Sequence, residues 1–214
     1  NCLLSSGSGV RISSGAPFFI MGDQVFSIAA FYKFTKISLL SELQTEFYEF
    51  LESLSIKGTV LLAEEGINGT VSGSSKSIDK FKNFLFEKDL LSESDFKVSS
   101  ADFMPFPRLK VKLKKEIVTI GDCEINPVEK VGEYVDPLDW NQLITDEDVL
   151  VLDTRNTYEV SIGSFEGAIQ PETTNFREFP EWAETEGSKL PKDKKIAMFC
   201  TGGIRCEKAS SFLK

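Results

Sequence analysis

Two short, continuous apolar runs in the last third of the chain most limit how it can fold. DVLVLDTR covers residues 148–155, and KIAMF covers residues 195–199. An unbroken apolar run of this length is typical of a strand buried on both faces of a parallel sheet. A helical pattern lies between the two runs, around residues 179–185. The alternation therefore predicts a parallel α/β domain over residues 149–214.

The first half of the chain has a different pattern. A β-rich run over residues 25–34 precedes an apolar stripe of helical period that opens after Ser38, which we expect to cap the helix. A strand over residues 57–63, the turn EEGING, a partner strand, and a second helix from Ser75 follow, with further strands near 96–103 and 109–120. This β-α-β-β-α-β order is that of a ferredoxin-like sandwich.

The expected organisation has four parts. Residues 1–21 read as a non-globular extension, residues 22–121 as the ferredoxin-like domain, residues 122–148 as a connector, and residues 149–214 as the second domain. The Ser-rich, acid-poor start also fits the remnant of an organelle transit peptide; otherwise we expect a cytoplasmic protein. We further expect the parallel sheet to be incomplete, since the pattern of its last helix runs to the end of the sequence.

Composition excludes several classes of protein. The chain has no histidine, so a Ser-His-Asp triad, a Cys-His pair and a two-His-one-carboxylate iron site are ruled out. Its four cysteines include no C-x-x-C pair, and no apolar run is long enough to cross a bilayer. The net charge of −9 comes from residues 122–214, which hold 10 basic and 19 acidic residues, whereas residues 22–121 hold 13 and 14. A polyanion would therefore meet the first half at lower electrostatic cost.

The segment after the second apolar run combines a thiol, a flexible backbone and a cation. Cys200 ends the run, and Arg205 follows five positions later. The residues between them are Thr201, Gly202, Gly203 and Ile204. Their N–H groups can surround a sulfur anion, and a thiolate or persulfide is the natural occupant. A helix N-terminus supplies only ~0.3–1 kcal/mol, and one pKa unit needs ~1.4 kcal/mol, so we expect the loop amides and Arg205 to share the stabilisation.

The C-x4-R spacing and an upstream segment resemble the rhodanese domain. LDTRNTYEVSIGSFEGA, residues 152–168, is similar to the rhodanese D-x-R-x-x-x-E signature, with Ser164 where histidine is usual. Asp153 and Arg155 are expected to form an ion pair that supports the site. For Cys206 a packing role is favoured, with a resolving thiol as the alternative. A buried thiol beside a plain Gly-Gly turn is the alternative for Cys200 itself.

Four motifs in order extend this resemblance to a narrower family. KGTVLLAEEGINGTVSGS, PFPRLKVKLKKEIVTIG, TTNFREFPEW and FCTGGIRCEKAS resemble the rhodanese-domain tRNA uridine hydroxylases. The resemblance implies oxygen-dependent formation of 5-hydroxyuridine at the wobble position, with tRNA as partner, molecular oxygen as co-substrate, and Cys200 and Arg205 as catalytic residues. No other cofactor and no structural metal is evident. The alternatives are a sulfurtransferase carrying a persulfide and a non-catalytic binding module.

The motif RLKVKLK suggests where RNA is contacted. Arg108, Lys110, Lys112 and Lys114 alternate with apolar residues, so they share one face of a strand at ~6.6–7 Å intervals. We expect this ladder to bind tRNA phosphates; a solvated face, or an edge strand protected by lysines, is the alternative. In FREFPEW the aromatic spacing favours a core position over a shelf for a base.

Overall fold

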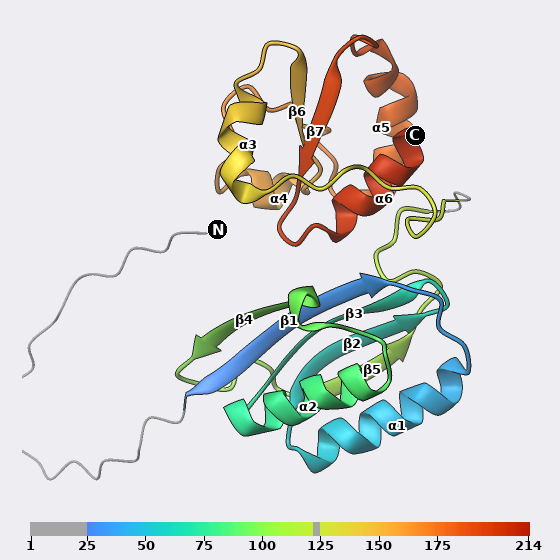
Figure 1. The fold of residues 1–214 in the computed structure, drawn as a ribbon, viewed down its shortest axis with the longest axis vertical. Helices are drawn as coiled ribbons and strands as arrows, with labels where there is room; N and C mark the ends of the chain where they lie inside the picture. The colour runs from blue at the N-terminus through green and yellow to red at the C-terminus, as the bar shows by residue number, and fades with distance from the viewer. Residues whose placement is uncertain (1–24, 122–124) are drawn as a thin grey trace, which may run out of the picture.

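The computed structural model describes residues 25–121 and 125–214, which form two α/β parts one above the other (Figure 1). The expected extension over residues 1–21 lies outside the described residues. We call residues 25–121 the front part; it is a five-stranded sheet with two helices on one face. We call residues 125–214 the rear part; it carries the cysteine loop.

The front sheet has the strand order β4-β1-β3-β2-β5. Its elements are β1 (Phe26–Phe34), α1 (Leu40–Ser53), β2 (Lys57–Ala63), β3 (Gly66–Gly73), α2 (Ser75–Glu87), β4 (Phe96–Ala101) and β5 (Leu109–Leu113). The first four strands pair antiparallel in the ferredoxin-like arrangement, as the sequence predicts. β5 is an additional edge strand that pairs parallel to β2 and is shorter than the expected 109–120.

The helices cover one face of this sheet because alternate strand residues are apolar. Phe47 and Leu51 of α1 and Phe81 of α2 are buried against Val60 and Val71 of the central strands. The expected cap is wrong at Ser38: α1 begins after Leu39, whose φ is 55°, and no side chain caps the first turn. The apolar stripe of α1 therefore sets its start without help from a hydroxyl cap.

A two-residue connection joins β2 to β3 and depends on Gly66. This residue has φ 152°, and a Cβ there would lie 2.1 Å from the carbonyl oxygen of Lys33. Only glycine allows β3 to leave the turn so close to β1. The EEGING motif is thus a hairpin connection, the reading that its turn residues favour.

The rear part has a two-stranded parallel sheet, as the apolar runs predict. It contains α3 (Pro137–Ile144), β6 (Val149–Asp153), α4 (Thr157–Val160), α5 (Phe179–Thr185), β7 (Lys195–Phe199) and α6 (Ile204–Leu213), and β6 pairs with β7. Short 3-10 turns, η1 (Glu93–Asp95), η2 (Phe176–Glu178) and η3 (Gly187–Lys189), complete the element order. Phe176 and Phe179 are buried in the rear core, which confirms the core interpretation of FREFPEW.

Helix α6 joins the two parts. Lys208 is 1% exposed and lies 2.9 Å from Glu65 Oε1 of the front hairpin and 2.5 Å from Glu116 Oε2 of the segment after β5. At the preceding residue of α6, Tyr32 of β1 donates a hydrogen bond of 2.7 Å to Glu207 Oε1. The helix that follows the cysteine loop is therefore fixed to the front sheet by buried polar contacts.

Candidate active site at the cysteine loop

The loop places the Cys200 sulfur at the carboxyl end of β7 and at the N-terminus of α6. The N–H of Gly203 donates to Cys200 Sγ over 2.9 Å. Gly203 has φ 98°, and a Cβ there would lie 2.5 Å from the hydroxyl oxygen of Tyr32. The left-handed conformation and the close approach both require glycine. Thr201, Gly202 and Ile204 complete the turn around the sulfur.

The Arg205 guanidinium binds the Glu159 carboxylate, and its charge also acts on the Cys200 sulfur. Its two terminal nitrogens donate to the two oxygens of Glu159 in α4, with Nη2 2.7 Å from Oε1. Thr201 also donates to this carboxylate. Two charge-assisted hydrogen bonds of this kind are strong and fix the orientation of the guanidinium. The pKa of Glu159 is lowered to about 2, chiefly by Arg205.

The surroundings of Cys200 favour its thiolate. Its pKa is lowered well below the ordinary thiol range, first by a hydrogen bond from the Cys206 thiol, and then by the Cys206 N–H, the Arg205 charge and the Gly202 N–H; burial opposes these effects. The pKa of Cys206 is raised correspondingly, because its thiol lies beside this anion. The Cys206 sulfur lies 3.5 Å from the Thr154 hydroxyl oxygen and lines the same cavity as Cys200. Whether Cys206 serves packing or acts as a resolving thiol stays a prediction.

Asp153 and Arg155 form an ion pair below the loop. Arg155 Nη2 lies 2.7 Å from Asp153 Oδ2, and the carboxylate of Asp153 is fully buried. Ser164, which stands where rhodaneses usually have histidine, donates to the same oxygen over 2.8 Å. The hydroxyl thus keeps a hydrogen bond at this position. The pair braces the carboxyl end of β6 beside the cysteine loop.

A cavity of about 840 Å³ opens at the sulfur. Its lining includes Cys200 and Cys206, Glu207 on the first turn of α6, Tyr134 of the connector and Lys97 of β4. Burial raises the pKa of Glu207, against the opposing effect of the hydrogen bond from Tyr32. The cavity is large enough for a nucleoside-sized ligand.

Sequence reasoning missed the side chains that the front sheet contributes to this site. Tyr32 contacts Glu207, and Lys97 Nζ donates to the Gly202 carbonyl oxygen over 3.1 Å. These residues lie more than 100 positions from the loop, so no local motif points to them. Glu159 had a signal, because it is the acidic residue of the D-x-R-x-x-x-E segment.

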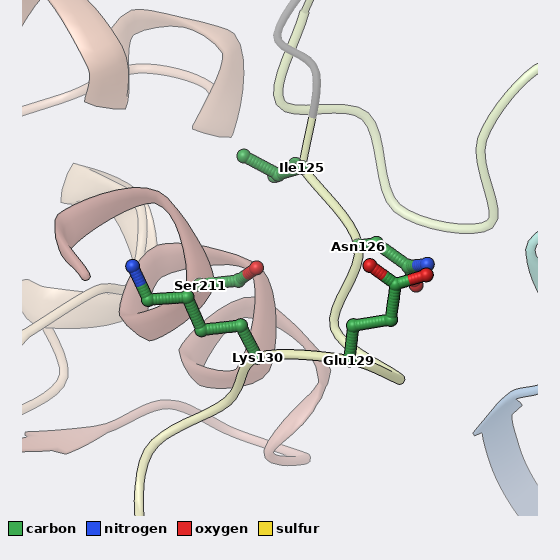
Figure 2. Close-up of a pocket in the computed structure, with 5 residues that line it drawn as sticks. All are labelled: Ile125, Asn126, Glu129, Lys130 and Ser211. Atoms are coloured by element: carbon green, nitrogen blue, oxygen red, sulfur yellow. The ribbon is translucent and has the colours of Figure 1, made fainter.

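A second hollow, of about 460 Å³, lies between the connector and α6 (Figure 2). Its lining residues are Ile125, Asn126, Glu129, Lys130 and Ser211. The Lys130 and Glu129 side chains leave the connector backbone in different directions (Figure 2). The lining of this hollow includes neither Cys200 nor Cys206 nor any other residue of the loop. We therefore assign the reactive site to the larger cavity.

The predicted basic ladder lies on the β5 edge of the front sheet. Lys110 and Lys112 belong to β5 and pair with Thr59 and Leu61 of β2. Arg108 and Lys114 flank the strand and extend its backbone pairing, through Gly58 N to Arg108 O and Lys114 N to Leu62 O. All four alternate with Leu109, Val111 and Leu113, of which Val111 is buried and Leu113 is 38% exposed. Their binding of RNA remains a prediction.

Within residues 25–121 and 125–214, no group of three or more His, Cys, Asp or Glu side chains is placed to hold a metal ion. None of the helices in this part of the chain has the length and apolar character needed to span a membrane.

The fold and the loop define a two-domain protein with a rhodanese-like rear part. Residues 136–214 match the rhodanese-like domain family, and residues 26–117 match the family described as the UPF0176 acylphosphatase-like domain. The chain thus joins a UPF0176 acylphosphatase-like domain to a rhodanese-like domain, and the resemblance to the tRNA uridine hydroxylases is confirmed by its relatives.

It is 51% identical over 192 residues to a tRNA uridine(34) hydroxylase of Bartonella quintana (strain Toulouse), covering 90% of this chain and 63% of that protein. It is 50% identical over 188 residues to one of Picosynechococcus sp., covering 88% and 63%. The chain therefore spans 63% of the length of these relatives. A solved acylphosphatase of Coxiella burnetii superposes with a TM-score of 0.32 at 15% identity, covering 42% of this chain and 94% of that one.

Proposed function

We propose that the chain forms part of an enzyme that hydroxylates the wobble uridine of tRNA to 5-hydroxyuridine, with molecular oxygen as co-substrate and Cys200 as the reactive group. The relatives named tRNA uridine(34) hydroxylase support the substrate and the reaction. The observation that carries the role of Cys200 is its position: the sulfur accepts the Gly203 N–H over 2.9 Å and borders a cavity that fits a nucleoside.

The residues around the sulfur have distinct roles in this proposal. The Cys206 thiol and the loop N–H groups keep Cys200 ionised, so that it can act as a nucleophile or carry sulfane sulfur. Arg205 supplies positive charge to the loop while Glu159 fixes its orientation. Asp153 and Arg155 hold the adjacent strand end. Glu207 and Tyr134 border the space that the base would occupy.

Replacing Cys200 in the full-length protein tests the proposal. A strain that lacks the gene is complemented with wild type or with Cys200→Ala, and digested tRNA is analysed for 5-hydroxyuridine by mass spectrometry. We expect the modification to return with wild type but not with Cys200→Ala. An exposed substitution on α5, Glu181→Gln, is the matched control and should restore it. Full modification in the Cys200→Ala strain would contradict the assignment of the sulfur.

The same loop is suited to a persulfide, so sulfur transfer is the second candidate. A thiosulfate:cyanide assay of the purified protein separates the two. Sulfur transfer at a high rate, together with unchanged hydroxyuridine in the deletion strain, would favour the sulfurtransferase. Absence of both activities would favour a binding module.

A further inference from the structure

The face of the front sheet opposite α1 and α2 carries positive charge on its outer strands. At one end of the face, Phe34 and Ala63 are buried against Ile117. Side chains alternate across a strand, and the residues on this open face include four lysines and several hydroxyl or amide groups. They are Lys57, Lys97, Lys110, Lys112, Thr59, Asn68, Thr70 and Ser99. The five strands contain no aspartate or glutamate at all. In a chain of net charge −9, this concentration of positive charge without acids is unusual.

One row of side chains crosses all five strands of the open face. The strand registers align Lys97, Ala30, Thr70, Thr59 and Lys110 in this order. Four strand spacings of ~4.8 Å make the row ~19 Å wide, with an ammonium group at each end and hydroxyl groups between. None of the four lysines forms an ion pair with the described residues. Their charges are therefore available to an anionic partner.

One end of this row contacts the reactive loop. Lys97, at its β4 end, donates to the Gly202 carbonyl oxygen over 3.1 Å. The next row along β1 contains Tyr32, whose hydroxyl approaches Gly203 and binds Glu207. The rear part lies on the side of the sheet away from α1 and α2 (Figure 1). A polymer lying along the open face would therefore meet lysines on the sheet up to the rim of the cavity, where Glu133 and Glu207 are the acidic lining residues.

We propose that the open face of the five-stranded sheet is the surface that holds the tRNA strand, with phosphates on Lys57, Lys97, Lys110 and Lys112, and that it delivers the target uridine to Cys200. This inference rests on the proposed function. Ammonium groups supply the sequence-independent attraction to phosphate, and the threonine hydroxyl groups bind sugar or base edges. Asn68 is occupied, because its amide donates to the Ile117 carbonyl oxygen over 2.8 Å. The strand ladder expected from RLKVKLK is one edge of this larger surface.

Charge removal on the two faces of the sheet tests the assignment. Full-length wild type, Lys97→Gln/Lys110→Gln and the control Lys76→Gln/Lys80→Gln are titrated with a fluorescently labelled tRNA anticodon stem-loop by anisotropy at 50–200 mM salt. Both double variants lose two charges, but the control pair lies on α2, away from the open face. Each lost phosphate contact should weaken binding about 8-fold near 0.1 M salt and reduce the salt slope by ~0.7–0.9.

We therefore expect the open-face variant to bind about 50-fold more weakly with a slope lower by about 1.5, and the control to match wild type. Unchanged affinity and slope in the open-face variant would overturn the surface while leaving the hydroxylase proposal in place. Equal losses in both double variants would also overturn it, because the attraction would then depend only on net charge. Failure of wild type to bind the stem-loop, with normal 5-hydroxyuridine in the deletion strain, would overturn both proposals.

Discussion

Removing the carboxylate of Glu159 tests how the reactive loop is held together. Its two oxygens accept hydrogen bonds from both terminal nitrogens of Arg205, from the Thr201 hydroxyl and from the Asn156 N–H. Glu159→Gln keeps the size and part of the acceptor capacity but removes the charge. The Arg205 guanidinium then loses its ionic partner while remaining largely buried, with its side chain 12% exposed.

The pKa of Glu159 sets the expected loss of stability. A pKa of about 2 instead of 4.5 corresponds to about 3 kcal/mol at 1.4 kcal/mol per tenfold change. Because solvent still reaches the pair, we expect about half of this, about 1.5 kcal/mol at neutral pH. The folded-state pKa is depressed, so this stabilisation is complete above the unfolded value of 4.5 and is lost as the pH falls through about 2.

Urea denaturation of wild type and Glu159→Gln between pH 7 and pH 3 measures this effect. The difference in unfolding free energy should be largest at pH 7 and should narrow below about pH 4.5. The exposed control Glu181→Gln should behave like wild type throughout. Equal stability of Glu159→Gln and wild type at pH 7, or a difference that persists unchanged in acid, would refute the argument.

Three further predictions concern the sulfur and the contacts between the two parts. Cys206→Ala should raise the pKa of Cys200, because it removes the donor thiol, and the pH profile of iodoacetamide alkylation should move to higher pH; an unmoved profile would exclude that hydrogen bond. Lys208→Ala should lower the unfolding free energy by about 3–5 kcal/mol in urea titrations, since its two carboxylate partners stay without a cation; a loss under 1 kcal/mol would mean that water replaces the ammonium group. Gly203→Ala should destabilise the fold, because its Cβ would meet the Tyr32 hydroxyl. In a double-mutant cycle measured by thermal melting, Tyr32→Phe should recover part of this loss. Purely additive losses of stability would show that the two residues do not clash.

Features within one element could be predicted from the sequence. The unbroken apolar runs became β6 and β7, because this pattern depends on neighbouring residues alone. Ser38 failed as a cap because the packing of the apolar stripe decided the start of α1. Local propensity was overridden there by tertiary contacts.

The candidate site was only partly predictable. The cysteine, its glycines and the ion pair of Asp153 with Arg155 lie in short motifs, so their proximity follows from the strand ends. The partner of Arg205 did not follow from spacing, because the choice between a thiolate and the Glu159 carboxylate depends on where α4 returns to the loop. The contributions of Tyr32 and Lys97 to the site could not be predicted, because these residues come from the other domain.

Helix α6 begins one residue after Gly203 and carries both Glu207 and Lys208, which bind the front part. The N-terminus of α6 at the sulfur and the two residues that bind the front part therefore lie within two turns of the same helix. A tilt of the front domain would rotate α6 and so move the N–H groups around the sulfur, which would couple the proposed binding of tRNA to the ionisation of Cys200.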